Sequence, residues 1–95
     1  MNEAIKRLTA IVIGRVQGVS FRYYTRREAK TLGLEGWVAN QRDGTVIVVA
    51  EGPEQQLTRL INFLRRGSPA AHVENVDIDW STAQANFKDF QIRWI

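Results

Sequence analysis

The sequence lacks cysteine entirely and has one histidine, His72, among 95 residues. Without cysteine there can be no disulfide, no thiolate nucleophile and no cysteine-ligated metal. No apolar run approaches the roughly 20 residues that span a bilayer, and the start of the chain has no apolar signal-peptide core. We therefore expect a cytoplasmic protein with no membrane partner.

The composition is that of an ordinary globular protein, with 44% hydrophobic and 24% charged residues. Its length suits one domain, residues 1–95, with a single two-layer core. Thirteen Lys and Arg against ten Asp and Glu give a net charge of +3, compatible with a small anionic ligand or with nucleic acid. Five basic residues fall between Arg15 and Lys30, a run for which a solvated helix face is the ordinary interpretation.

Hydrophobic periodicity predicts five strands and two helices. The strands are expected at residues 7–13, 34–40, 45–52, 76–80 and 90–94, and the helices from Phe21 to about Gly33 and from Pro53 to about Gly67. The order β-α-β-β-α-β-β indicates an α+β fold, the ferredoxin-like split β-α-β sandwich, with an antiparallel sheet of about five strands and two helices on one face. RNA-binding and metal-binding domains use the same layout, so the fold alone does not choose a function.

The segment "GRVQGVS", residues 14–20, joins the first strand to the first helix. In this fold the first and second strands end at the same edge of the sheet, which brings the segment opposite Asn40. Unpaired backbone N–H groups before a helix can form a nest for an anion, and glycine lets the chain curl closely around it. Arg22 falls in the first helical turn, where a positive charge is unfavourable unless an anion is bound. The residues alone leave two interpretations open, an anion site and an ordinary strand–helix connection.

No acid or base residue accompanies this segment. His72 lies beyond the second helix, and the turn that contains Asp43 is enough to explain that residue. An enzyme without a general acid needs a leaving group that departs unprotonated. A carboxylate, whose conjugate acid has a pKa of about 4, meets this condition, and an alkoxide does not. A mixed carboxylic–phosphoric anhydride is therefore the substrate type that such a site could hydrolyse.

Two stretches, "GRVQGVSFR" and "LGLEGWVANQRDGTV", closely resemble the signature stretches of the acylphosphatases. The resemblance continues through "VVAEGPEQQL" and "GSPAAHV" to "FQIRW", and so covers nearly the whole chain. It implies hydrolysis of acyl phosphates to a carboxylate and inorganic phosphate without metal or cofactor. It also implies a small-molecule acyl phosphate as partner, inorganic phosphate as product and competitive inhibitor, and a monomer.

The same resemblance assigns residues. The catalytic arginine of the family falls on Arg22, which would bind the phosphoryl group, and its catalytic asparagine falls on Asn40, which would orient the attacking water. The phosphate-binding residues fall on Gln17, Gly18, Val19, Ser20 and Phe21 together with Arg22, with Gly14 and Arg15 introducing the loop. Gln17 is expected to contribute its N–H, and both Phe21 and Trp37 are expected in the core rather than against substrate.

The sequence departs from the family pattern in three places. Ile47 stands where a glutamate is frequent, Ala39 where a basic residue is common, and Trp94-Ile95 where the chain often ends in tyrosine. We expect none of the three to touch Arg22, Asn40 or the loop, and we expect them to affect stability or substrate access.

Two other functions are compatible with the same layout. A nucleic-acid-binding module would display aromatic and basic residues on its central strands, and "LTAIVIG" and "TVIVVAE" contain no aromatic residue and no Arg or Lys. A module of a larger carbamoyl-transfer enzyme, as in hydrogenase maturation, would be expected with zinc-finger cysteines, which this sequence lacks. We expect a free-standing enzyme with no nucleic-acid partner.

Overall fold

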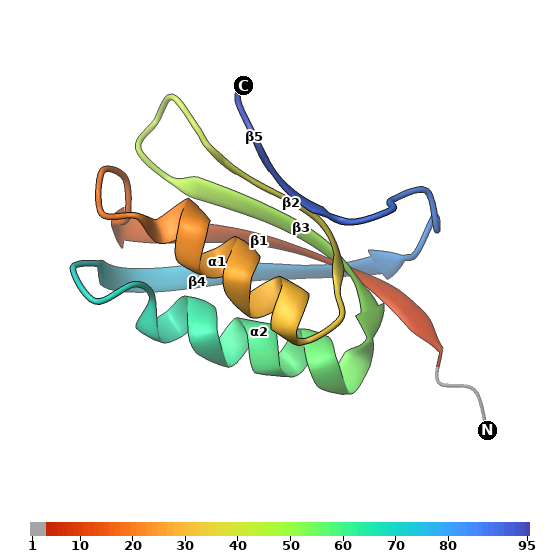
Figure 1. Ribbon diagram of the computed structural model, residues 1–95. Helices are drawn as coiled ribbons and strands as arrows, with labels where there is room; N and C mark the ends of the chain where they lie inside the picture. Colours follow the sequence, from red (N-terminus) through yellow and green to blue (C-terminus); the bar gives the residue numbers. More distant parts are fainter. Residues whose placement is uncertain (1–3) are drawn as a thin grey trace.

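The computed structural model describes residues 4–95 and contains the seven elements in the predicted order (Figure 1). They are β1 (Ile5–Arg15), α1 (Phe21–Thr31), β2 (Glu35–Asn40), β3 (Val46–Pro53), α2 (Glu54–Arg66), β4 (His72–Thr82) and β5 (Phe90–Arg93). Both helices cover one face of a five-stranded sheet of order β4-β1-β3-β2-β5. The ferredoxin-like α+β fold predicted from the sequence is confirmed.

One strand differs from the expected antiparallel sheet. β5 pairs with β2 in parallel, whereas the other three pairs are antiparallel. β4 ends beside the beginning of β1, where Thr82 pairs with Lys6. The segment 83–89 then crosses to the other edge of the sheet without returning to the opposite end. β5 therefore starts at the end where β2 starts, and the sheet is mixed.

The core lies between the helices and one face of the sheet. Alternate residues of the central strands, among them Leu8, Ala10 and Val48, are fully buried, as strand geometry requires of a face that packs against helices. α2 contributes Leu57, Leu60, Ile61, Phe63 and Leu64, the spacing expected of a helix with one apolar face. α1 buries Phe21, Thr25 and Ala29, so Phe21 is a core residue as predicted.

Trp37 is placed differently from the prediction. It is half-buried, and the guanidinium Cζ of Arg93 lies 5.0 Å from its ring centroid. The fourth strand also begins earlier than predicted, at His72, and the fifth ends at Arg93, so that Trp94 follows the strand.

A buried carboxylate, Glu51, holds the crossing segment. It accepts hydrogen bonds from the Nε of Arg7 at 2.7 Å and from the backbone N–H groups of Gln84 and Ala85 at 2.8 and 3.0 Å. Burial alone would raise the pKa of Glu51, but these donors and the charge of Arg7 outweigh it, and the pKa lies below its usual value. The ionised carboxylate thus fixes the segment that delivers β5 to β2.

Candidate active site

Three connections meet at one end of the sheet (Figure 1). They are the β1–α1 loop (residues 16–20), the β2–β3 turn (residues 41–45) and the α2–β4 connection (residues 67–71). β3 lies between β1 and β2, and both of these strands end here. The expected meeting of the loop with the end of β2, where Asn40 lies, is therefore found.

The β1–α1 loop follows a tight irregularity in β1. The register between β1 and β4 shifts after Ile13, and a Cβ at Gly14 would lie 2.2 Å from the carbonyl oxygen of His72. Gly18 and Ser20 then both adopt positive φ, 74° and 61°. A Cβ at Gly18 would meet no atom within 4 Å, so the backbone conformation rather than crowding favours glycine there. These turns curl the chain before α1 begins.

The curled backbone leaves its donors unused. Within residues 4–95, no protein group accepts a hydrogen bond from the N–H groups of residues 17–21. Ser20 is the N-cap residue of α1 but makes no side-chain capping bond, and the first turn of α1 has no acidic residue. Free N–H groups at a helix N-terminus form a site of positive potential. The loop therefore has the backbone arrangement of an anion-binding nest.

Two side chains tie the loop to its neighbours. Gln17 donates from Nε2 to the carbonyl oxygens of Gln41 at 2.7 Å and Thr45 at 2.9 Å. The buried Ser68 donates its hydroxyl to the carbonyl of Val19 at 2.8 Å. These bonds use carbonyl oxygens and side-chain groups, so they fix the loop without using its N–H groups.

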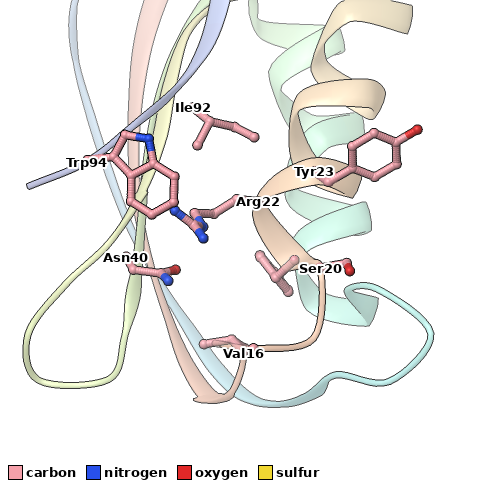
Figure 2. A pocket seen from close by; sticks show the side chains of 9 residues that line it. Val16, Ser20, Arg22, Tyr23, Asn40, Ile92 and Trp94 are labelled. Atoms are coloured by element: carbon pink, nitrogen blue, oxygen red, sulfur yellow. The ribbon is translucent and has the colours of Figure 1, made fainter.

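A pocket of about 320 Å³ opens beside the loop (Figure 2). Its lining residues come from the loop, the first turn of α1, the end of β2 and the C-terminal segment: Val16, Gly18, Ser20, Phe21, Arg22, Tyr23, Asn40, Ile92 and Trp94. Figure 2 shows the guanidinium of Arg22 between Asn40 and Trp94, with the Asn40 amide directed toward it. Arg22 and Asn40, which are 18 residues apart in the chain, therefore share one pocket.

Arg22 is the most unusual polar group of this pocket. Its Nη1 is buried and has no hydrogen-bond partner within residues 4–95. A buried donor of a charged group is costly when unpaired, and more so than a neutral one. An anion in the pocket would satisfy it, and the planar guanidinium can present two N–H groups to two phosphate oxygens.

The other predicted site residues fall into two groups. Gly18, Ser20 and Phe21 line the pocket with Arg22 and Asn40, whereas Gln17 and Val19 do not. The side chain of Gln17 reaches the β2–β3 turn, and Val19 packs against the core. Both can offer only backbone N–H groups to a ligand, which is the contribution expected of Gln17.

Four lining residues were not predicted as site residues: Val16, Tyr23, Ile92 and Trp94. The expectation that the departure at Trp94 would not touch Arg22 is wrong, because the Trp94 ring lies over the Arg22 guanidinium. Its place beside Arg22 depends on the parallel pairing of β5 with β2, and no local pattern in the sequence reveals that pairing.

Asp43 and His72 lie outside the pocket, as predicted. Asp43 accepts hydrogen bonds from the hydroxyl and the N–H of Thr45, and these lower the pKa of its carboxyl. It therefore stabilises the β2–β3 turn. His72 is exposed at the start of β4.

Two of the three departures from the family pattern are one structural feature. Ala39 and Ile47 are direct partners in the β2–β3 ladder. Directly opposed residues in an antiparallel pair lie on the same face of the sheet. An apolar pair therefore occupies two positions at which the acylphosphatase pattern often has charged residues. Neither residue lines the pocket.

The class that this geometry defines is a ferredoxin-like α+β protein with a curled loop of unused backbone N–H groups at one end of its sheet. The comparisons with known proteins identify the family. The Acylphosphatase family model matches residues 8–92. An acylphosphatase of Salinibacter ruber is 49% identical over 88 residues, covering 93% of this chain and 93% of its own length.

Solved structures point to the same family as the sequence comparisons. The crystal structure of acylphosphatase from Bacillus subtilis matches with a TM-score of 0.90 at 39% identity, covering 93% of this chain and 98% of that chain. The crystal structure of T. kodakarensis HypF matches with a TM-score of 0.80 at 28% identity, covering 93% of this chain but 12% of that chain. The same fold thus also forms a small part of a much longer protein.

This chain belongs to the acylphosphatase family. The comparisons support a hydrolase that acts on acyl phosphates, which confirms the activity expected from the sequence. Neither helix of residues 4–95 is long and apolar enough to cross a membrane.

Proposed function

We propose that the loop N–H groups and Arg22 bind the phosphoryl group of an acyl phosphate, and that Asn40 orients the attacking water. The observation that carries this proposal is the buried Nη1 of Arg22, which has no partner among residues 4–95, beside a loop whose N–H groups are likewise unused within that range, in a pocket that Asn40 also lines. Residues 17–21 supply N–H donors, and Arg22 supplies positive charge. These groups stabilise the charge on the equatorial phosphate oxygens in the transition state.

The reaction then needs little further chemistry from the protein. The water oxygen forms a bond to phosphorus while the bond from phosphorus to the acyl oxygen breaks. The carboxylate leaves with that bonding pair and needs no proton. None of the pocket residues is His, Asp or Glu. We therefore propose that a phosphate oxygen of the substrate accepts the proton of the water.

The direct test of this mechanism is turnover without metal. The purified protein is expected to hydrolyse acetyl phosphate and benzoyl phosphate in EDTA at the rate found without chelator, because every group assigned above belongs to the chain. Release of inorganic phosphate in the presence and absence of EDTA and added Mg²⁺ measures this. Turnover that requires added metal would overturn the mechanism.

Two substitutions separate the proposed roles. Arg22→Ala should raise the inhibition constant of inorganic phosphate by tenfold or more, because a charge-assisted bidentate contact is lost. Asn40→Ala should lower kcat about 10²-fold while leaving that constant within about twofold, because it acts on the water. Arg93→Ala is the control, since Arg93 is exposed and does not line the pocket. Equal effects of the two variants on phosphate inhibition would contradict the assignment.

Four further expectations belong to this proposal. Inorganic phosphate should inhibit competitively, which initial-rate kinetics tests. Residues 1–95 should form one domain and the protein should be a monomer, which a single unfolding transition and light scattering test. A cytoplasmic location is proposed from the sequence and is tested by cell fractionation.

A further inference from the structure

Trp94 lies at the rim of the pocket with its indole ring over the guanidinium of Arg22 (Figure 2). The Cζ of Arg22 is 4.3 Å from the ring centroid, well within the range of a cation–π contact. Trp94 is nevertheless 81% exposed, so the fold gains little from burying it. Its contact with Arg22 therefore has to be explained by something other than core packing.

A ring and a carboxylate hold an arginine in different ways. A carboxylate binds the edge of the guanidinium, where the N–H groups lie, and neutralises its charge. An aromatic ring covers the face and leaves both the edge donors and the charge available. Arg22 has the second kind of partner, and within residues 4–95 no carboxylate forms an ion pair with it.

We propose that Trp94 is a positioning residue for Arg22, whose indole fixes the plane of the guanidinium so that its edge faces the phosphoryl group. This inference rests on the proposed phosphate-binding role of Arg22. The ring restricts the side chain before the ligand arrives, and less conformational freedom is then lost on binding. The benefit is the same for substrate, transition state and inorganic phosphate.

Uniform stabilisation of this kind has a kinetic signature. Trp94→Ala should raise KM for acetyl phosphate and the inhibition constant of phosphate by the same factor, about two- to fivefold, and leave kcat within about twofold. Trp94→Phe should restore both constants to near the original values because it keeps a ring. Trp80→Ala is the matched control, since Trp80 is also an exposed tryptophan but lies on β4 outside the pocket.

A spectroscopic measurement gives a readout that a structural role would not move. In a Trp37→Phe, Trp80→Phe chain, Trp94 is the sole tryptophan. Titration with inorganic phosphate should change its fluorescence with a midpoint equal to the inhibition constant. The change should disappear in the same chain carrying Arg22→Ala.

The outcomes separate this inference from the proposed function. Unchanged constants in Trp94→Ala, failure of Trp94→Phe to restore them, or an indole signal that ignores phosphate would each overturn the positioning role. If Arg22→Ala still weakened phosphate inhibition, the proposed function would stand without it. If Arg22→Ala had no such effect, the proposed site itself would be wrong.

Discussion

Two arginines, Arg7 and Arg22, lie toward opposite ends of the sheet and each stacks on an aromatic ring. The Cζ of Arg7 is 4.9 Å from the ring centroid of Phe87, and that of Arg22 is 4.3 Å from Trp94. Arg7 also donates to the buried carboxylate of Glu51 at 2.7 Å. Arg22 has no such partner within residues 4–95, and its Nη1 is buried without a hydrogen bond.

The difference indicates what each end of the molecule does. Around Arg7 the charges are balanced and the donors are satisfied, which stabilises the crossing segment and thereby the position of β5. Around Arg22 no carboxylate among residues 4–95 neutralises the positive charge. This lowers the stability of the fold and favours the binding of an anion. The contrast supports the proposal that Arg7 stabilises the fold and that Arg22 binds the ligand.

The largest effect on activity is expected from removal of Arg22, the arginine without a carboxylate partner among residues 4–95. Arg22→Ala is expected to lower kcat/KM about 10³-fold or more, because positive charge at the transferring phosphoryl group is lost. Its free energy of unfolding should change by less than about 1 kcal/mol, because the variant also removes a buried unpaired donor. Acyl phosphate kinetics and urea unfolding of one preparation measure both. A large loss of stability would place Arg22 with Arg7 as a structural residue.

At the end of the sheet where Arg7 pairs with Glu51, a substitution is expected to lower stability and to change activity little. Glu51→Gln should lower the free energy of unfolding by about 2–4 kcal/mol, because the amide leaves Arg7 unpaired and cannot accept all three hydrogen bonds. Well below its unfolding temperature, this variant should keep most of its kcat, since Glu51 does not line the pocket. Glu54→Gln is the control, because Glu54 pairs with Lys6 at the exposed surface and should contribute less than about 1 kcal/mol.

The pH dependence of stability tests the same carboxylate. The pKa of Glu51 is lower in the folded protein than its ordinary value of 4.5. Its stabilising contribution is therefore complete above that value and is lost as the pH falls through the folded pKa. The difference in unfolding free energy between the original chain and Glu51→Gln should accordingly shrink from neutral pH to about pH 3. A difference that stays constant over this range would show that Glu51 does not stabilise the fold as a carboxylate.

The sequence predicted the meeting of Arg22 with Asn40 better than it predicted the residues that surround them. Arg22 and Asn40 could be placed together because the order of strands and helices determines which strand ends meet, and that order is readable from periodicity. The stack of Trp94 on Arg22 and the hydrogen bonds of Glu51 depend on the path of residues 83–89. That segment has no regular periodicity, and its contacts are made with strands more than 30 residues away. Sequence patterns carry little information about such contacts.

The smallest expected effect concerns the tie between the loop and the β2–β3 turn. Gln17→Met keeps the backbone N–H and the approximate side-chain size but removes both hydrogen bonds to Gln41 and Thr45. The inhibition constant of phosphate and KM should each rise about three- to tenfold, because a loosened loop loses more freedom on binding. The free energy of unfolding should fall by about 1–2 kcal/mol because two hydrogen bonds are lost.

Gln56→Met is the matched control. It removes the hydrogen bond to the Leu32 carbonyl, far from the pocket, and should leave phosphate inhibition unchanged. If both variants lost only stability, the side chain of Gln17 would belong with Glu51 among the groups that hold the fold. A selective rise in the inhibition constant would instead assign it to the phosphate-binding end, as a residue that holds the loop in place without touching the ligand through its side chain.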